Sequence, residues 1–138
     1  SMDSKPMKSD VPSATGSLQN ATPVSSLTIA HAFQGPSIAS LARENGRGPV
    51  IVWISEELDA LNKICGGGLD QASITYCAEL ILDRYKFRTV NAFRLALRDG
   101  LNSGKIYGKL TYPVIAQWLT EHEEKVEQVA FQNHMGTK

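Results

Sequence analysis

The sequence has 138 residues, a length that suits one domain with a modest hydrophobic core. Its 42% hydrophobic and 20% charged residues are typical of a soluble globular protein, and no apolar run approaches the roughly 18 residues of a membrane span. No hydrophobic stretch follows a basic start, so we expect no secretory signal and a cytoplasmic location. In that reducing compartment we expect Cys65 and Cys77 to be buried free thiols.

Residues 1–36 are rich in Ser, Thr, Pro, Asn and Gly. Such a composition buries too little apolar area to offset the entropy of ordering the chain. We therefore predict a disordered tail over residues 1–36 and a helical domain over residues 37–138. One apolar island in the tail, residues 27–33, is expected to pack on the domain as an extended arm rather than to bind a partner.

Capping residues and apolar periodicity predict the first two helices of this domain. Ser37 can cap a short helix that stops at Gly46. Pro49 suits the first turn of a second helix, since its missing N–H costs nothing there. Apolar residues then recur at three- and four-residue spacing from Val50 to Ile64, which is the stripe of an amphipathic helix.

Three more helices complete the prediction. Asp70 caps the third and Thr89 the fourth, which weakens before the glycine-containing loop that starts at Gly104. Thr111 and Pro113 open a long last helix.

Five helices with short links form a compact all-α bundle. Trp53 and Trp118 lie within apolar stripes and are predicted to be core residues. Residues 50–54 are β-branched or aromatic and also fit a buried strand. No second strand offers a partner, so we favour the helix.

Catalytic and metal-binding motifs fail on their spacing. Gly104-Lys105 resembles the end of a phosphate-binding loop, but Asp99 and Ile106 replace residues that the motif requires. The segment 121–124 resembles a helical zinc-protease motif, yet Val126 stands where the second histidine belongs. We therefore expect no metal, no cofactor and a non-enzymatic binding module, with an enzyme assembled from distant residues as one alternative.

The net charge of zero conceals a basic segment, residues 84–109, between acidic flanks. Its cations interleave with Tyr85 and Phe87, and two arginines follow one helical turn apart. Because cations contact phosphates and exposed rings stack on bases, this pattern predicts a nucleic-acid site. The predicted contact residues are Lys86, Arg88, Arg94, Arg98, Lys105 and Lys109. The alternative is that both aromatic residues are core and that neighbouring acids neutralise the cations.

The last helix is acidic on its exposed face, where Glu121, Glu123, Glu124 and Glu127 gather. We expect this helix, or the tail, to contact a protein partner. A purely protein-binding adaptor without nucleic-acid contact is the main alternative to the nucleic-acid module. A contiguous exposed basic face would favour nucleic acid, and dispersed cations would favour the adaptor.

Several stretches carry a family resemblance: residues 40–46 (SLARENG), 78–85 (AELILDRY), 90–93, 104–110 and 115–119 (IAQWL). Through them, residues 38–126 resemble a family of uncharacterised small helical proteins of Bacteroides-type bacteria, their phages and their mobile elements. Such genes recur among replication and mobilisation functions, and the shape is similar to that of helicase-loader accessory domains. The resemblance implies an accessory role in DNA replication or mobile-element maintenance.

Overall fold

The computed structural model describes residues 23–104 and 108–136. Within them, five α-helices follow two short 3₁₀ helices, and no β-strand is present: η1 Val24–Ser26, η2 Ile29–Phe33, α2 Ile38–Asn45, α3 Arg47–Ile64, α4 Gln71–Tyr85, α5 Val90–Asn102 and α6 Tyr112–Gly136. The predicted all-α fold is confirmed, and the alternative strand over residues 50–54 is wrong. The expected disorder of residues 1–22 and the site residue Lys105 lie outside the described residues.

The helix starts are fixed by the side chains that the sequence indicated. The side-chain oxygens of Ser37, Asp70 and Thr89 each accept a hydrogen bond from the backbone N–H three residues later, at 2.8–3.0 Å. Between α2 and α3 the chain turns at Gly46, where φ is +91°. Only glycine adopts that conformation without strain, which explains the sharp corner.

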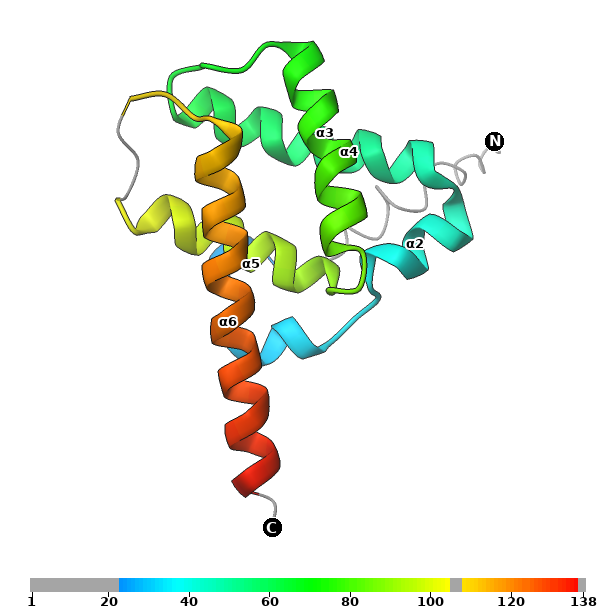
Figure 1. Ribbon diagram of the computed structural model, residues 1–138, viewed down its shortest axis with the longest axis vertical. Coiled ribbons are helices and arrows are strands. Elements are labelled where there is room, and N and C mark those ends of the chain that lie inside the picture. The colour runs from blue at the N-terminus through cyan, green and yellow to red at the C-terminus, as the bar shows by residue number, and fades with distance from the viewer. Residues whose placement is uncertain (1–22, 105–107, 137–138) are drawn as a thin grey trace.

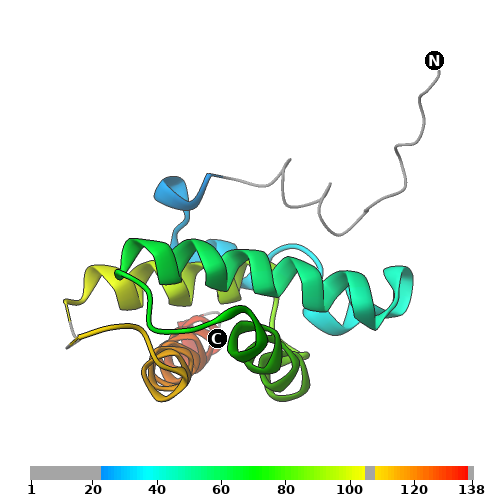
Figure 2. The ribbon, with the colours of Figure 1, turned by 90° about the horizontal axis from the view of Figure 1, so that it is seen from above.

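The helices pack in two crossed layers. Helices α3 and α5 form one layer, and α4 and α6 run across it in the other (Figures 1 and 2). Both tryptophans are core residues, as predicted: Trp53 meets the ring of Phe93 edge-on at 5.5 Å, and Trp118 packs directly over Gly100. This second contact sets how closely α5 approaches α6.

The start of α2 holds the turn between α4 and α5. The backbone N–H groups of Ile38 and Ala39 donate to the carbonyl oxygens of Arg88 and Lys86, at 2.9 and 2.7 Å. A helix start leaves its first backbone N–H groups without an intrahelical acceptor, and here two carbonyl oxygens of the turn accept from them. The backbone of the turn over residues 86–89 is therefore held in place by α2.

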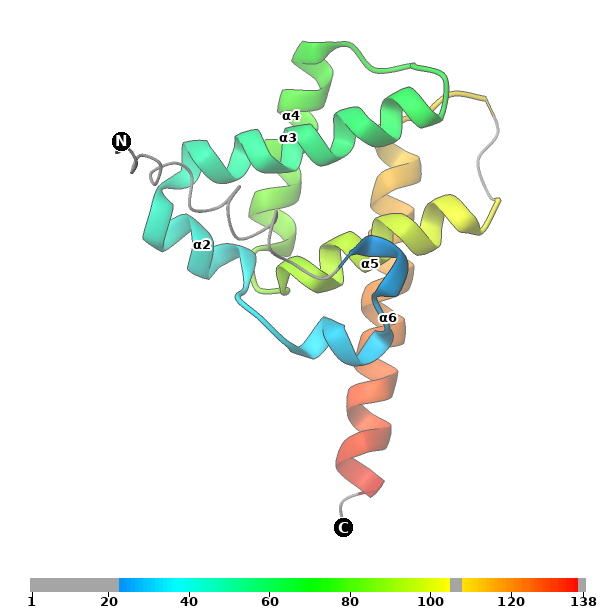
Figure 3. The same ribbon diagram turned by 180° about the vertical axis from the view of Figure 1, so that it is seen from behind.

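Residues 23–36 correct the predicted boundary of the tail. They fold as η1 and η2 against the outer face of α5 (Figure 3), so the helical domain begins before residue 37. Leu27 and Ala32 are buried there. The predicted packing of the apolar island is thus confirmed, but its expected extended conformation is wrong, because residues 29–33 form the 3₁₀ helix η2. We call residues 23–36 the arm.

The structure bears on two expectations from composition: the state of the two cysteines and the lack of a membrane span. Cys77 is a buried free thiol, whereas Cys65, also free, is only half-buried. Among the described helices, none combines the length and the apolar composition that crossing a membrane requires.

Candidate functional site

Arg88, a predicted phosphate ligand, lies in an intramolecular ion-pair network. Its Nε donates to Glu123 at 2.7 Å, and a terminal nitrogen donates to Glu127 at 2.6 Å. These bonds tie the α4–α5 turn to α6. The Arg88 and Glu123 side chains are both about one-third exposed, so this pair is partly shielded from solvent, whereas the Glu127 side chain is 62% exposed.

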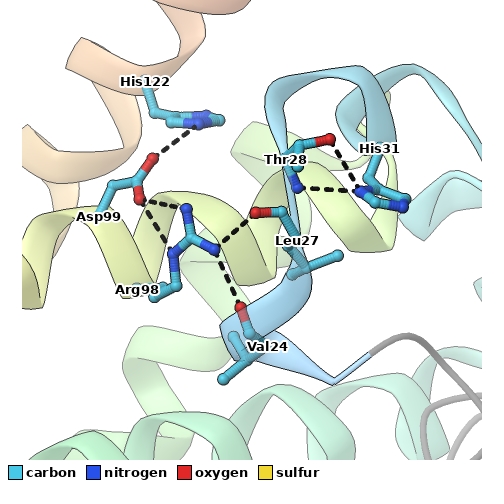
Figure 4. Close-up of polar contacts among 7 residues, drawn as sticks. All are labelled: Val24, Leu27, Thr28, His31, Arg98, Asp99 and His122. Carbon is cyan, nitrogen blue, oxygen red and sulfur yellow. Dashed lines mark hydrogen bonds and ion pairs between the residues drawn. The ribbon is translucent and has the colours of Figure 1, made fainter.

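Arg98 is also used within the molecule. One terminal nitrogen donates to the carbonyl oxygens of Leu27 and Val24, at 2.6 and 3.0 Å (Figure 4). Its Nε and other terminal nitrogen both donate to Asp99 Oδ1, at 3.1 and 2.8 Å. Arg98 therefore clamps the arm onto α5.

Arg94 on α5 interacts electrostatically with an acid on α3, the other helix of the same layer. Burial raises the pKa of the Glu57 carboxyl on α3, and the positive charge of Arg94 on α5 opposes that rise. Arg88 and Arg98 thus each donate hydrogen bonds to a carboxylate of this same chain, and Arg94 interacts with one through its charge. For these three residues, the alternative of local neutralisation describes the structure.

The tip of the α4–α5 turn is an exposed part of the predicted site. Phe87 is 80% exposed, and the ammonium group of Lys86 lies 5.3 Å from its ring centroid. Tyr85 is buried. The interpretation of both rings as core residues therefore holds for Tyr85 and is wrong for Phe87.

Lys109 lies far from this turn. It contacts the loop before α4, at Gly68, whereas Lys86 follows the last residue of α4. A helix of 15 residues separates the two ends, and its length is about 22 Å at 1.5 Å per residue. The five predicted contact residues that the structure describes therefore form no contiguous basic face.

His122 belongs to a buried polar contact that the sequence did not reveal. It is 6% exposed, and its Nε2 lies 3.6 Å from Asp99 Oδ2, too far for a hydrogen bond (Figure 4). Burial lowers the pKa of His122; Asp99 opposes the shift, and Lys125 and Arg98 add to it. The available signal was its position four residues after Trp118 and four before Val126, on the buried face of α6.

A hollow of about 150 Å³ adjoins this contact, and its lining includes Asp99, Ser103, Glu121 and His122. It is smaller than the roughly 300–1,000 Å³ of small-molecule sites. The Ser103 hydroxyl donates to the carbonyl oxygen of Gly100 at 2.6 Å. Within the described residues, no three His, Cys, Asp or Glu side chains are placed to hold a metal ion. The arrangement places the His122 imidazole of α6 beside the Asp99 carboxylate of α5, in surroundings that disfavour the charged imidazole.

The C-terminal part of α6 extends beyond the other helices (Figure 1). Among the side chains of α6 described up to residue 134, Val126 is the last buried one; Val129 is half-buried, and residues 130–134 are exposed. Phe131 is 64% exposed and forms a shallow depression with Glu124, Glu127, Gln128 and Gln132. We call residues 127–136 the projecting segment.

Comparisons with protein-family models, with curated proteins and with solved structures gave no match to this chain. The resemblance of residues 38–126 to a family of small helical proteins therefore stays a prediction.

Proposed function

We propose that this chain is a protein-binding module that inserts the projecting segment of α6 into a groove of its partner. The observation that carries the proposal is the exposure of Phe131 near the end of α6, where residues 130–134 are all exposed. Short helical segments are marginal in water, and burying their apolar residues against a partner stabilises them. Docking of a helix into an apolar groove is a common mode of recognition.

The surroundings of Phe131 define the chemistry of the groove. Positions 124, 127, 128, 131 and 132 follow helical spacing and form one face, on which a single ring is surrounded by acids and amides. A complementary groove has one apolar pocket and a basic rim. The acidic helix was the predicted protein contact, and the dispersed cations favour the adaptor over the nucleic-acid module.

Site-specific photo-crosslinking tests this function. A photoreactive phenylalanine analogue replaces Phe131 in the full chain, expressed in its source cells. The matched control carries it at Tyr76, which is 63% exposed on α4. We expect one discrete protein adduct from position 131 and none from position 76. The adduct should weaken when Glu124→Lys reverses a charge on the same face, and equal patterns from both positions would contradict the proposal.

A second candidate function is single-stranded nucleic-acid binding at the α4–α5 turn, favoured by the exposure of Phe87 beside Lys86. Titration with a labelled oligonucleotide at about 50 mM salt tests it, with an expected log–log salt slope of roughly 0.7 per phosphate contact. Phe87→Ala and Lys86→Glu should each weaken binding. The absence of binding by the folded wild type rejects this candidate. Charge reversal at Arg98 is not a clean test, because it also releases the arm.

A further inference from the structure

We propose that the surface of α5 and α6 beneath the arm is a peptide-binding groove, which residues 23–36 occupy as an intramolecular ligand. The partner is a peptide that presents a leucine and, five residues later, a small apolar residue. This groove is separate from the projecting segment, and the proposal does not depend on the function inferred for that segment.

The arm is held mainly through its backbone. Side chains of Arg98, Asn91 and Thr89, the last being the cap of α5, donate to four main-chain carbonyl oxygens at 2.6–3.2 Å. These oxygens belong to Val24, Leu27, Ala32 and Gln34. Peptide sites obtain affinity from such main-chain bonds, which any sequence can offer, and specificity from pockets for particular side chains.

Two side chains of the arm provide the specificity. Leu27 and Ala32 are 3% and 4% exposed, and they pack on a small apolar cluster formed by Ala92, Leu95 and Val126. This cluster is distinct from the main core, which contains both tryptophans. The arm can therefore leave without opening the main core, and the groove persists.

The principal donor is oriented from within the domain. Asp99 accepts two hydrogen bonds from Arg98, and this leaves the remaining terminal nitrogen directed at the arm (Figure 4). A donor that is held in place before binding loses less conformational freedom when a peptide arrives.

The arm also has the features of a detachable ligand. A hydrogen bond within the arm closes its second 3₁₀ turn, because the Thr28 N–H donates to His31 Nδ1 at 2.9 Å. The chain leaves the groove at Gly35, where φ is +86°, and the next residue, Pro36, is anchored by the Val90 N–H at 3.0 Å. Rotation of the backbone at Gly35 can therefore release the residues before it from the groove, while Pro36 and the helical domain stay in place.

The experiment asks whether the vacated groove binds the arm sequence in trans. Leu27→Asp in the full chain places a charge in the apolar pocket and should release the arm. Val24→Asp is the matched control, since it adds the same charge at a side chain that is 42% exposed. The probe is a fluorescent peptide of residues 23–36, and binding is followed by anisotropy. Leu27→Ala serves as a milder variant if the Asp substitution prevents folding.

We expect the Leu27→Asp variant to bind the peptide, and the wild type and Val24→Asp to bind at least about tenfold more weakly because their own arm competes. Adding Arg98→Ala to Leu27→Asp should lower the affinity about tenfold or more, the loss of a charged donor. A peptide carrying aspartate in place of Leu27 should not bind. Folded variants that bind no peptide at about 1 mM, or bind it independently of Arg98, overturn the proposal. Unfolding of both Leu27 variants also overturns it, because the groove would not exist without the arm.

Discussion

Replacing Gly100 by alanine tests the contact that sets the distance between α5 and α6. A Cβ at this position would lie 2.2 Å from Cδ2 and 2.3 Å from Cγ of Trp118, where real contacts stay above 3.0 Å. Trp118 is only 4% exposed, so its indole cannot swing out without losing its own packing. Overpacking of this severity costs about 3 kcal/mol, and the better helix propensity of alanine returns about 1 kcal/mol. We expect a net loss of about 2 kcal/mol.

The same substitution should change sign once the indole is removed. Trp118→Ala alone is expected to cost about 3–5 kcal/mol, as aromatic truncations in cores do. In that background a Cβ at position 100 meets no ring, so Gly100→Ala should be neutral or stabilising by up to about 1 kcal/mol. The double-mutant cycle then gives a coupling of about 2–3 kcal/mol. Urea unfolding followed by far-UV circular dichroism measures all four proteins. Equal destabilisation by Gly100→Ala in both backgrounds would refute the steric argument.

Three further predictions concern polar contacts. The folded-state pKa of His122 is lowered, so around pH 6.5 and just below it the unfolded chain binds more protons than the folded one. The free energy of unfolding should therefore fall as the pH drops through about 6.5. His122→Gln should remove this pH dependence, which urea titrations at about pH 7.5 and 5.5 would measure. Arg88→Ala should cost about 1–2 kcal/mol by stranding Glu123, and high salt should shrink the difference from wild type. Asn62→Ala should cost about 2 kcal/mol in the same assay, since the Asn62 amide bonds both the N–H and the carbonyl of Leu69, at 3.1 and 2.8 Å. A pH profile unchanged in the His122 variant, or losses near zero in the other two, would contradict the respective contact.

The sequence by itself determined the order, type and approximate ends of the helices. Ser37, Asp70 and Thr89 cap as predicted because a cap and its N–H partner are three residues apart, so the interaction is local. The two tryptophans were placed in the core for a similar reason, since an apolar stripe follows from helical periodicity alone.

Only the tertiary structure decided what the charged and aromatic residues of the basic segment do. The acids that pair with Arg88 are 35 and 39 residues away in the chain, and the carbonyls bound by Arg98 are 71 and 74 residues away. Local patterns show that a cation is present, but they do not show which distant group the fold brings to it. The same holds for Tyr85 and Phe87, two residues apart, of which one is buried and one exposed. Their fates differ because α4 ends between them, and a helical period no longer determines which way a side chain points once the helix has ended.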